Sequence, residues 1–270
     1  PGKKSDLVPE GCTVHTLAGP TQDVQGSLDE LAARVGASGR EPARQSPMRP
    51  DRPQGKFTAD KICKAIGHLL PERAIVVDEA QTSGVMLPMM TSGAPRHDVL
   101  TLTGGAIGQG LPCAVGAAIA CPDRPVLALV GDGSAMYTIQ ALWTMAREKL
   151  DVVAVIFNNR SYAILNVELQ RVGAGEAGGK ARSQLDLADP ALDFVHMARG
   201  MGVPAVRATT TDEFVLALDA AFRTPGPHLI DAVVPSAISG LKLRLLPHVL
   251  GSLQRLPASL GRTIKRKLAP

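Results

Sequence analysis

The sequence predicts an α/β fold with a doubly wound, mostly parallel sheet and helices on both of its faces. Short apolar runs rich in β-branched residues alternate with stretches whose apolar residues recur at helical spacing. Several of the runs are apolar throughout, which is typical of strands that are covered on both faces. The composition agrees, because 45% of the 270 residues are hydrophobic and 20% are charged, enough for a sizeable core.

The chain begins with a short segment that cannot form such a core alone. In residues 1–37 the sequence predicts one strand at 12–17 and one helix at 24–35. Residues 38–56 follow with four prolines and two glycines, the composition of a linker. We therefore expect the main domain to occupy residues 57–235.

The main domain is expected to alternate between strands and helices. The predicted strands are Ala74–Val77, Leu100–Thr103, Val126–Val130, Val152–Phe157, Ala205–Ala208 and Leu229–Val234. The predicted helices are Thr58–Leu69, Gly108–Ala120, Ile139–Glu148, Leu192–Met201 and Asp212–Phe222. Strands joined through helices in this way lie parallel, and ligands bind at the carboxyl ends of such strands.

The net charge of +4 is carried by a C-terminal tail, residues 236–270. The tail has seven Lys and Arg and no Asp or Glu, whereas the rest of the chain has 22 basic against 25 acidic residues. A nucleic-acid-binding core is therefore not expected. Prolines and glycines interrupt any long helix in the tail, so we expect it to pack over its own domain or a partner subunit. The alternative is contact of a basic amphipathic segment with a membrane or an anionic partner.

The lack of a recognisable targeting signal and the pattern of cysteines favour a cytoplasmic protein. No apolar run approaches the ~18–20 residues that cross a bilayer, and no leader of charged and then apolar residues is present. The chain starts with Pro1, so we interpret it as a piece of a longer protein. Its four cysteines form no CxxC, which favours buried, reduced thiols over disulfides.

Polar residues follow two successive predicted strands at a spacing suited to a metal site. Asp132 lies in Gly131–Ser134, directly after one strand, and 24 residues separate Gly133 from Asn158-Asn159 after the next. A right-handed crossover makes these two strand ends neighbours. Carboxylate and amide oxygens are hard ligands suited to Mg²⁺ or Ca²⁺. The backbone N–H groups of Gly133 and Ser134, at the start of a helix, would suit an anion.

This GDG-x24-NN pattern resembles the thiamine diphosphate-binding motif. From about Phe57 to Pro235 the sequence resembles the C-terminal domain of the acetolactate synthase and benzoylformate decarboxylase family, and residues 1–37 resemble the end of that family's central domain. The resemblance implies the thiamine diphosphate-binding fold. It also implies that Mg²⁺, bridging the two phosphates of the cofactor, binds the side chains of Asp132 and Asn159 and the main-chain carbonyl of Ser161.

Two further strand ends gain a role from the resemblance. Residues 104–112 are not GxGxxG, which disfavours a dinucleotide site and leaves a tight glycine turn as their structural interpretation. The resemblance implies that Gly105 and Ile107 hold the pyrimidine of the cofactor, with the Ile107 side chain keeping the cofactor bent. Residues 78–84 alone predict a helix cap, whereas the resemblance implies that Gln81 and Thr82 contact the terminal phosphate.

The segment from Tyr162 is expected to face the cofactor and the substrate. Leu165 stands where pyruvate decarboxylases carry a Glu, which favours an apolar substrate pocket. The resemblance implies an enzyme that uses thiamine diphosphate and Mg²⁺ to decarboxylate or ligate 2-oxoacids, similar to acetolactate synthase. The Glu that activates the cofactor in this family lies N-terminal to everything present here, and neither Glu79 nor Glu168 matches its position. We therefore expect no catalytic residue in this chain, and cofactor binding without turnover.

Two other functions remain as alternatives. The first is a non-catalytic cofactor-binding module, or one half of a split decarboxylase whose other chain binds the pyrimidine and supplies the Glu. The second, a nucleotide-binding Rossmann protein, is disfavoured because no GxGxxG opens a βαβ unit. For the enzyme we expect a 2-oxoacid substrate and a homodimer or homotetramer. The sequence does not identify the acceptor substrate or indicate whether FAD is bound.

Overall fold

The computed structural model describes residues 11–41, 49–171 and 178–235. The chain divides into two compact units, Pro1–Gln45 and Ser46–Pro270. The first unit contains α1 (Val24–Arg34), which confirms the predicted helix and has no buried residue. The strand predicted at 12–17 is wrong, because these residues have no regular secondary structure. A β-rich stretch forms a strand only beside a pairing neighbour, and the described part of this unit contains no other strand.

The second unit is built on one sheet of six parallel strands, as the sequence predicted. The strands are β1 (Ile75–Glu79), β2 (Asp98–Thr101), β3 (Val126–Gly131), β4 (Val152–Asn158), β5 (Ala205–Ala208) and β6 (His228–Val233). Their order across the sheet is β2-β1-β3-β4-β6-β5. Each predicted strand is present with its ends shifted by two residues at most.

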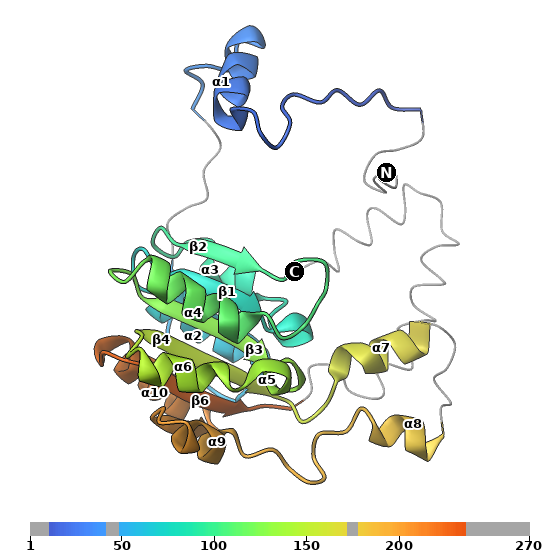
Figure 1. Cartoon of the computed structure of the whole chain (residues 1–270), viewed down its shortest axis with the longest axis vertical. Coiled ribbons are helices and arrows are strands. Elements are labelled where there is room, and N and C mark those ends of the chain that lie inside the picture. The colour runs from blue at the N-terminus through green and yellow to red at the C-terminus, as the bar shows by residue number, and fades with distance from the viewer. Residues whose placement is uncertain (1–10, 42–48, 172–177, 236–270) are drawn as a thin grey trace. The chain divides into compact units, whose positions relative to one another are not determined.

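One helix precedes the first strand, and others fill the connections between the strands (Figure 1). They are α2 (Ala59–Leu69), the 3-10 turn η1 (Gln81–Ser83), α3 (Leu87–Thr91), α4 (Gly110–Ala120), α5 (Asp132–Thr138), α6 (Ala141–Arg147), α7 (Ala163–Arg171), α8 (Gly179–Ser183), α9 (Phe194–Gly200) and α10 (Thr211–Arg223). The helix predicted at 139–148 is present as α6, with its ends shifted by two residues at most, and α5 precedes it in the connection from β3 to β4. The tail expected at 236–270 lies outside the described residues.

Each face of the sheet is covered by its own hydrophobic core. One core contains residues of α2, α3 and α10 with Val76, Leu129 and Val155 of the strands. The other contains residues of α4, α5, α6 and α9 with Val77 and Val130. Neighbouring residues of one strand thus enter opposite cores, because side chains alternate across a strand. This is the doubly wound arrangement that the sequence predicted.

The strand order reverses at β1. From β1 the chain crosses to β2 on one side and then returns to β3 on the other side. At such a reversal the connections leave in opposite directions, which opens a crevice at the carboxyl ends of β1 and β3. The four neighbouring strands β2, β1, β3 and β4 therefore present their carboxyl ends side by side.

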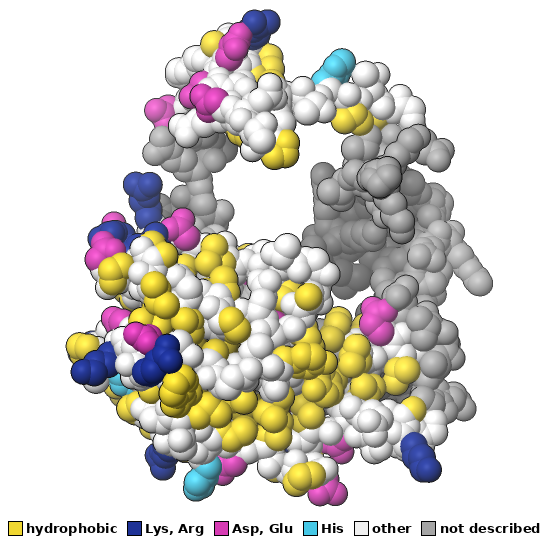
Figure 2. Space-filling model, viewed as in Figure 1, with side chains coloured by type: hydrophobic (Ala, Val, Ile, Leu, Met, Phe, Trp, Pro, Cys, Tyr) yellow, Lys and Arg dark blue, Asp and Glu magenta, His cyan; other side chains and the backbone are white. Residues whose placement is uncertain are grey.

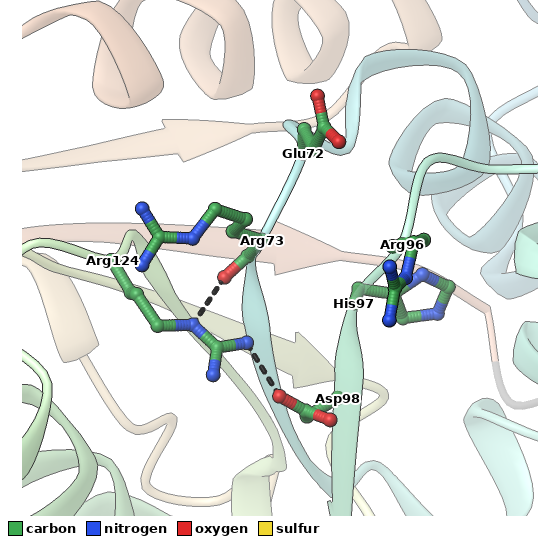
Figure 3. Close-up of a pocket in the computed structure, with 6 residues that line it drawn as sticks. All are labelled: Glu72, Arg73, Arg96, His97, Asp98 and Arg124. Carbon is green, nitrogen blue, oxygen red and sulfur yellow. Dashed lines mark hydrogen bonds and ion pairs between the residues drawn. The ribbon is translucent and has the colours of Figure 1, made fainter.

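At the opposite end of the sheet, arginine side chains form hydrogen bonds and ion pairs near the starts of β1, β2 and β3. Figure 3 shows Arg124 reaching from the loop before β3 to the carbonyl of Arg73 and the carboxylate of Asp98, at 2.6 Å each. Arg73 in turn pairs with Asp123 at 2.6 Å. A cavity of about 490 Å³ lies among these residues, but its arginines at positions 73 and 124 are neutralised by carboxylates. We interpret this cluster as a structural clasp.

No helix in the described ranges has both the length and the apolar character that are needed to span a membrane.

Candidate functional site

A cavity of about 470 Å³ lies at the carboxyl ends of β1 to β4, within the size range of small-molecule sites. It is lined by segments that follow four different strands: Ala80, Gln81, Thr82, Gly105, Ile107, Gly131, Asp132, Gly133, Ser134, Tyr137, Asn159, Ser161, Tyr162, Ala163, Ile164 and Leu165. Every site residue predicted above lies in this lining. The roles assigned to those residues stay predictions, since the lining shows placement only.

Asp132 is a buried carboxylate at the point where β3 passes into α5. Only 2% of the residue is exposed. Its Oδ1 accepts a hydrogen bond from the Gly133 N–H at 2.9 Å, and its Oδ2 accepts one from the Arg160 N–H in the loop after β4. Burial raises the pKa of Asp132 to about 6, although these backbone N–H groups act in the opposite direction. Within the described residues Asp132 has no ion-pair partner, so its charge lacks a neighbouring cation.

The two asparagines after β4 turn to different partners. Asn158 is buried, and its Nδ2 donates to Oδ1 of Asp231 at 2.9 Å. Asn159 lines the cavity, where its Oδ1 accepts from the Ser161 N–H at 3.0 Å and its Nδ2 donates to Ser83 Oγ at 3.3 Å. The first asparagine therefore stabilises the sheet, and the second one presents an oxygen at the cavity.

The loop after β4 contacts Asp132 through its backbone and adds oxygen atoms to the cavity lining. Arg160, whose N–H binds the Asp132 carboxylate, has a φ of 58°, in the left-handed region that non-glycine residues seldom adopt. The next residue, Ser161, lines the cavity, and its hydroxyl donates to the Leu185 carbonyl at 3.2 Å. The Ser161 carbonyl accepts from the Ala163 N–H at 2.8 Å and keeps a second lone pair. Strained backbone of this kind concentrates at functional sites.

Gly133 is required by a close approach of Tyr162. A Cβ at position 133 would lie 2.3 Å from Cε1 of the Tyr162 ring. Both Gly133 and Ser134 are buried in the first turn of α5, as predicted. The Gly133 N–H is directed to the Asp132 carboxylate rather than left for an outside anion, which limits its predicted role as an anion donor.

Two other walls complete the cavity. After β1, Gln81 and Thr82 form the start of η1, where Gln81 also has a left-handed φ of 51°. The helix cap predicted for this stretch is absent, because η1 has no side-chain cap; Asp78 instead accepts from the Ala80 N–H at 3.0 Å. After β2, Gly105 and Ile107 form another wall.

The outer part of the cavity is apolar. Tyr137, Ile164 and Leu165 line it and are 59%, 38% and 44% exposed. Because large apolar side chains at a pocket mouth favour apolar ligand groups, this end suits a hydrophobic substituent.

Some residues that support the site were missed by sequence reasoning. Glu79 accepts backbone hydrogen bonds from the loop before α4, and Asp231 holds Asn158 while it binds Arg207 at 2.9 Å. A carboxylate within a mostly apolar strand was the available signal for both. Their partners could not be read from the sequence, since they lie 24 to 73 residues away.

In the described part of the chain, no three His, Cys, Asp or Glu side chains are grouped to hold a metal ion. A metal ion in the cavity would therefore depend on the Asp132 carboxylate together with amide, main-chain and ligand oxygens. Such an all-oxygen set suits a hard divalent cation. A cation would also balance the buried charge of Asp132, so the residues present fit one.

Comparison with known proteins places the cavity within a matched region. A family model described as "Thiamine pyrophosphate enzyme, C-terminal TPP binding domain" matches residues 80–232. That range contains the whole cavity lining.

Similar proteins carry related names. The chain is 58% identical over 241 residues to IlvX of Mycobacterium tuberculosis, which bears the name of an acetolactate synthase large subunit, covering 88% of this chain and 46% of that protein. It is 32% identical to benzoylformate decarboxylase of Pseudomonas aeruginosa, covering 77% of this chain and 39% of that enzyme. The chain thus spans less than half the length of these relatives.

A solved structure shares the fold. The thiamine diphosphate-dependent 4-hydroxybenzoylformate decarboxylase of Rhodococcus jostii superimposes with a TM-score of 0.64 at 31% sequence identity. The match covers 78% of this chain and 39% of that structure.

Proposed function

Because the chain belongs to the thiamine pyrophosphate enzyme family, we propose that its cavity holds thiamine diphosphate with Mg²⁺ in an enzyme that acts on 2-oxoacids. The observation that carries this proposal is the contact between the loops after β3 and β4. It brings the Asp132 carboxylate and the Asn159 amide to the same cavity.

Each wall of the cavity has a proposed task. Asp132, Asn159 and the Ser161 carbonyl bind Mg²⁺. Gln81, Thr82 and Ser134 contact the diphosphate, and Gly133 lines the cavity beside them. Gly105 and Ile107 contact the pyrimidine. Tyr162, whose ring lies against Gly133, lines the cavity and contacts the cofactor. When bound, the cofactor supplies a carbon nucleophile for the carbonyl carbon of the substrate.

The proposed substrate is a 2-oxoacid with an apolar substituent. Ile164 and Leu165 would bind that substituent and exclude water from it. The names of the relatives, acetolactate synthase and benzoylformate decarboxylase, support carboligation or decarboxylation as the reaction.

A proton donor for the cofactor is expected from another polypeptide segment. Among the described residues that line the cavity, Asp132 is the one acidic residue, and it is assigned to the metal. Glu79 is committed to backbone N–H groups. Because neither carboxylate is available to donate a proton, the second candidate function is one half of a two-chain decarboxylase.

An exposed apolar surface supports contact with another chain. Figure 2 shows hydrophobic side chains gathered over the face that carries α4, α5 and α6. Ile119, Tyr137 and Trp143 are 59%, 59% and 53% exposed there. Apolar patches of this kind mark interaction sites, so we propose that a second copy or a pyrimidine-binding chain covers this surface.

We also propose a cytoplasmic location, with which the free thiols agree.

Calorimetric titration tests the proposal. The chain should bind thiamine diphosphate in the presence of Mg²⁺, and bind it at least tenfold more weakly when Mg²⁺ is replaced by a chelator. Asp132→Ala should remove this metal dependence, whereas Asp212→Ala, on the surface at the start of α10, should retain it. Metal-independent binding, or none, would overturn the assignment.

Turnover tests separate the two candidates. We expect the purified chain to bind the cofactor without decarboxylating pyruvate or benzoylformate. Activity that appears only when a partner chain is added would identify a half-enzyme. Activity of the chain alone would show that the proton donor lies within it.

A further inference from the structure

The buried carboxylate of Glu79 joins two walls of the cavity. Glu79 is the last residue of β1 and is 1% exposed. Directly after it come Ala80, Gln81 and Thr82, which form the first wall. Its side chain points to a different segment: Oε1 accepts from the Gly108 and Gln109 N–H groups, and Oε2 accepts from the Gly110 N–H at 2.7 Å. These three groups immediately follow the second wall, Gly105 and Ile107.

The second wall needs such an anchor. Gly104, Gly105 and Gly108 have positive φ values of 66°, 75° and 98°, in a conformation that glycine adopts at an entropic cost. A Cβ at Gly104 or Gly105 would meet no atom within 4 Å, so packing around these two glycines does not hold the loop. Hydrogen bonds hold it at its far end, where Thr138 Oγ1 also donates to the Gly108 carbonyl at 2.8 Å.

The anchor needs two acceptor oxygens, which a carboxylate side chain provides. The start of α4 has no side-chain cap of its own, since Gln109 makes no capping bond to the helix. Glu79 supplies from β1 the acceptors that a cap would offer, and a negative charge is favoured beside the N–H groups of a helix start. A glutamine would present one acceptor oxygen and an NH₂ group that faces another donor.

We propose that Glu79 is a positioning residue that sets the place of the 105–107 wall relative to the 80–82 wall, and thereby the affinity for the pyrimidine end of the cofactor. This proposal rests on the proposed function, because it takes thiamine diphosphate as the ligand. It differs from a role in helix stability alone: the diphosphate end, held by the other walls, should be little affected.

Two ligands separate these roles. Thiamine diphosphate would use all the walls, whereas inorganic pyrophosphate has no group to reach Gly105 and Ile107. Affinities for both are measured by calorimetry with Mg²⁺ for the full chain and for Glu79→Gln. We expect the variant to lose at least tenfold in affinity for thiamine diphosphate and less than threefold for pyrophosphate.

Two control variants account for general damage. Glu213→Gln makes the same change in a carboxylate that accepts the Thr209 and Thr210 N–H groups at the start of α10, outside the cavity lining. Leu218→Ala lowers stability from within the core under α10. Both should leave the ratio of the two affinities unchanged, even where Leu218→Ala lowers the Tm as much as Glu79→Gln does.

A second variant covers the case in which Glu79→Gln does not fold. Thr138→Val removes the other hydrogen bond to Gly108 with little change of shape, and it should shift the affinity ratio in the same direction. Equal losses for both ligands, or an unchanged ratio in either folded variant, would overturn the positioning role alone. Absence of thiamine diphosphate binding by the unmodified chain would overturn both this inference and the proposed function.

Discussion

At the scale of single residues, the site depends on polar side chains that are held by backbone groups. Asp132 binds the N–H groups of Gly133 and Arg160, and Asn159 binds that of Ser161. Such bonds fix the direction of a side chain before any ligand arrives, which lowers the cost of ordering on binding. Neighbouring residues such as Asn158 and Asn159 can therefore differ sharply in their contributions to ligand binding and to stability.

Replacing the two asparagines one at a time should separate binding from stability. Asn159→Ala should abolish Mg²⁺-dependent binding of thiamine diphosphate while changing the free energy of unfolding by less than about 1 kcal/mol. Asn158→Ala should lower that free energy by about 1–3 kcal/mol, because it leaves an oxygen of the buried Asp231 without its donor. Denaturant unfolding and calorimetry measure the two effects. Equal loss of binding and stability in both variants would contradict this division.

The cysteines should differ in reactivity. Burial, with a smaller contribution from the charges of Asp60 and Asp78, raises the pKa of Cys63 to about 12. At pH 8 only ~10⁻⁴ of this thiol is ionised, and the thiolate is the reactive form. Iodoacetamide should therefore label the exposed Cys12 in the native chain and leave Cys63 unlabelled, as read by mass spectrometry. All four cysteines should react in guanidinium chloride, and native labelling of Cys63 would contradict its burial.

At the scale of the elements, close approaches between helices limit the side chains that fit. Helix α2 passes so near to α3 that a Cβ at Gly67 would lie 2.0 Å from the Met90 carbonyl oxygen. Gly116, in the middle of α4, is exposed and would place a Cβ in open space. The same residue type thus has opposite consequences in two helices of equal length.

Gly67→Ala and Gly116→Ala should change stability in opposite directions. The first should lower the free energy of unfolding by about 1–3 kcal/mol, because the backbone of α3 must move. The second should raise it by about 0.5–1 kcal/mol through the higher helix propensity of alanine. Urea denaturation of both variants gives the comparison. Stabilisation by Gly67→Ala would show that α2 and α3 are less closely packed than described.

At the scale of the whole molecule, the sheet and its two cores lie in the unit from Ser46 onward. The unit before it contributes α1, whose residues are all at least partly exposed. Stability should therefore reside in the second unit, since buried apolar area is the main source of folding free energy.

Removal of residues 1–45 should leave the thermal stability nearly unchanged. We expect the Tm to shift by less than about 2 °C, equivalent to less than about 1 kcal/mol. Differential scanning calorimetry of the full and shortened chains measures the shift. A loss of 5 °C or more would show that the first unit contributes to the core.

The strands and the polar residues at their ends could be predicted, because both depend on local patterns. Runs such as Val152–Phe157 are apolar over their whole length, and Asp132 and Asn159 directly follow such runs. Predictions failed where the outcome depended on distant neighbours. The stretch 12–17 has strand propensity, yet no described strand lies in its unit to pair with it.

The sequence by itself determined that the chain forms a layered α/β domain with oxygen-bearing side chains after two successive strands. Periodicity and residue type are local properties, and they can be read from the sequence without knowledge of the fold. Only the tertiary structure decided which buried charges are held by which partners, as with Glu79 and Gly108–Gly110 or Asp231 and Asn158. The order of strands across the sheet sets those pairs, and hydrogen bonds between segments so far apart in the chain leave no local signal.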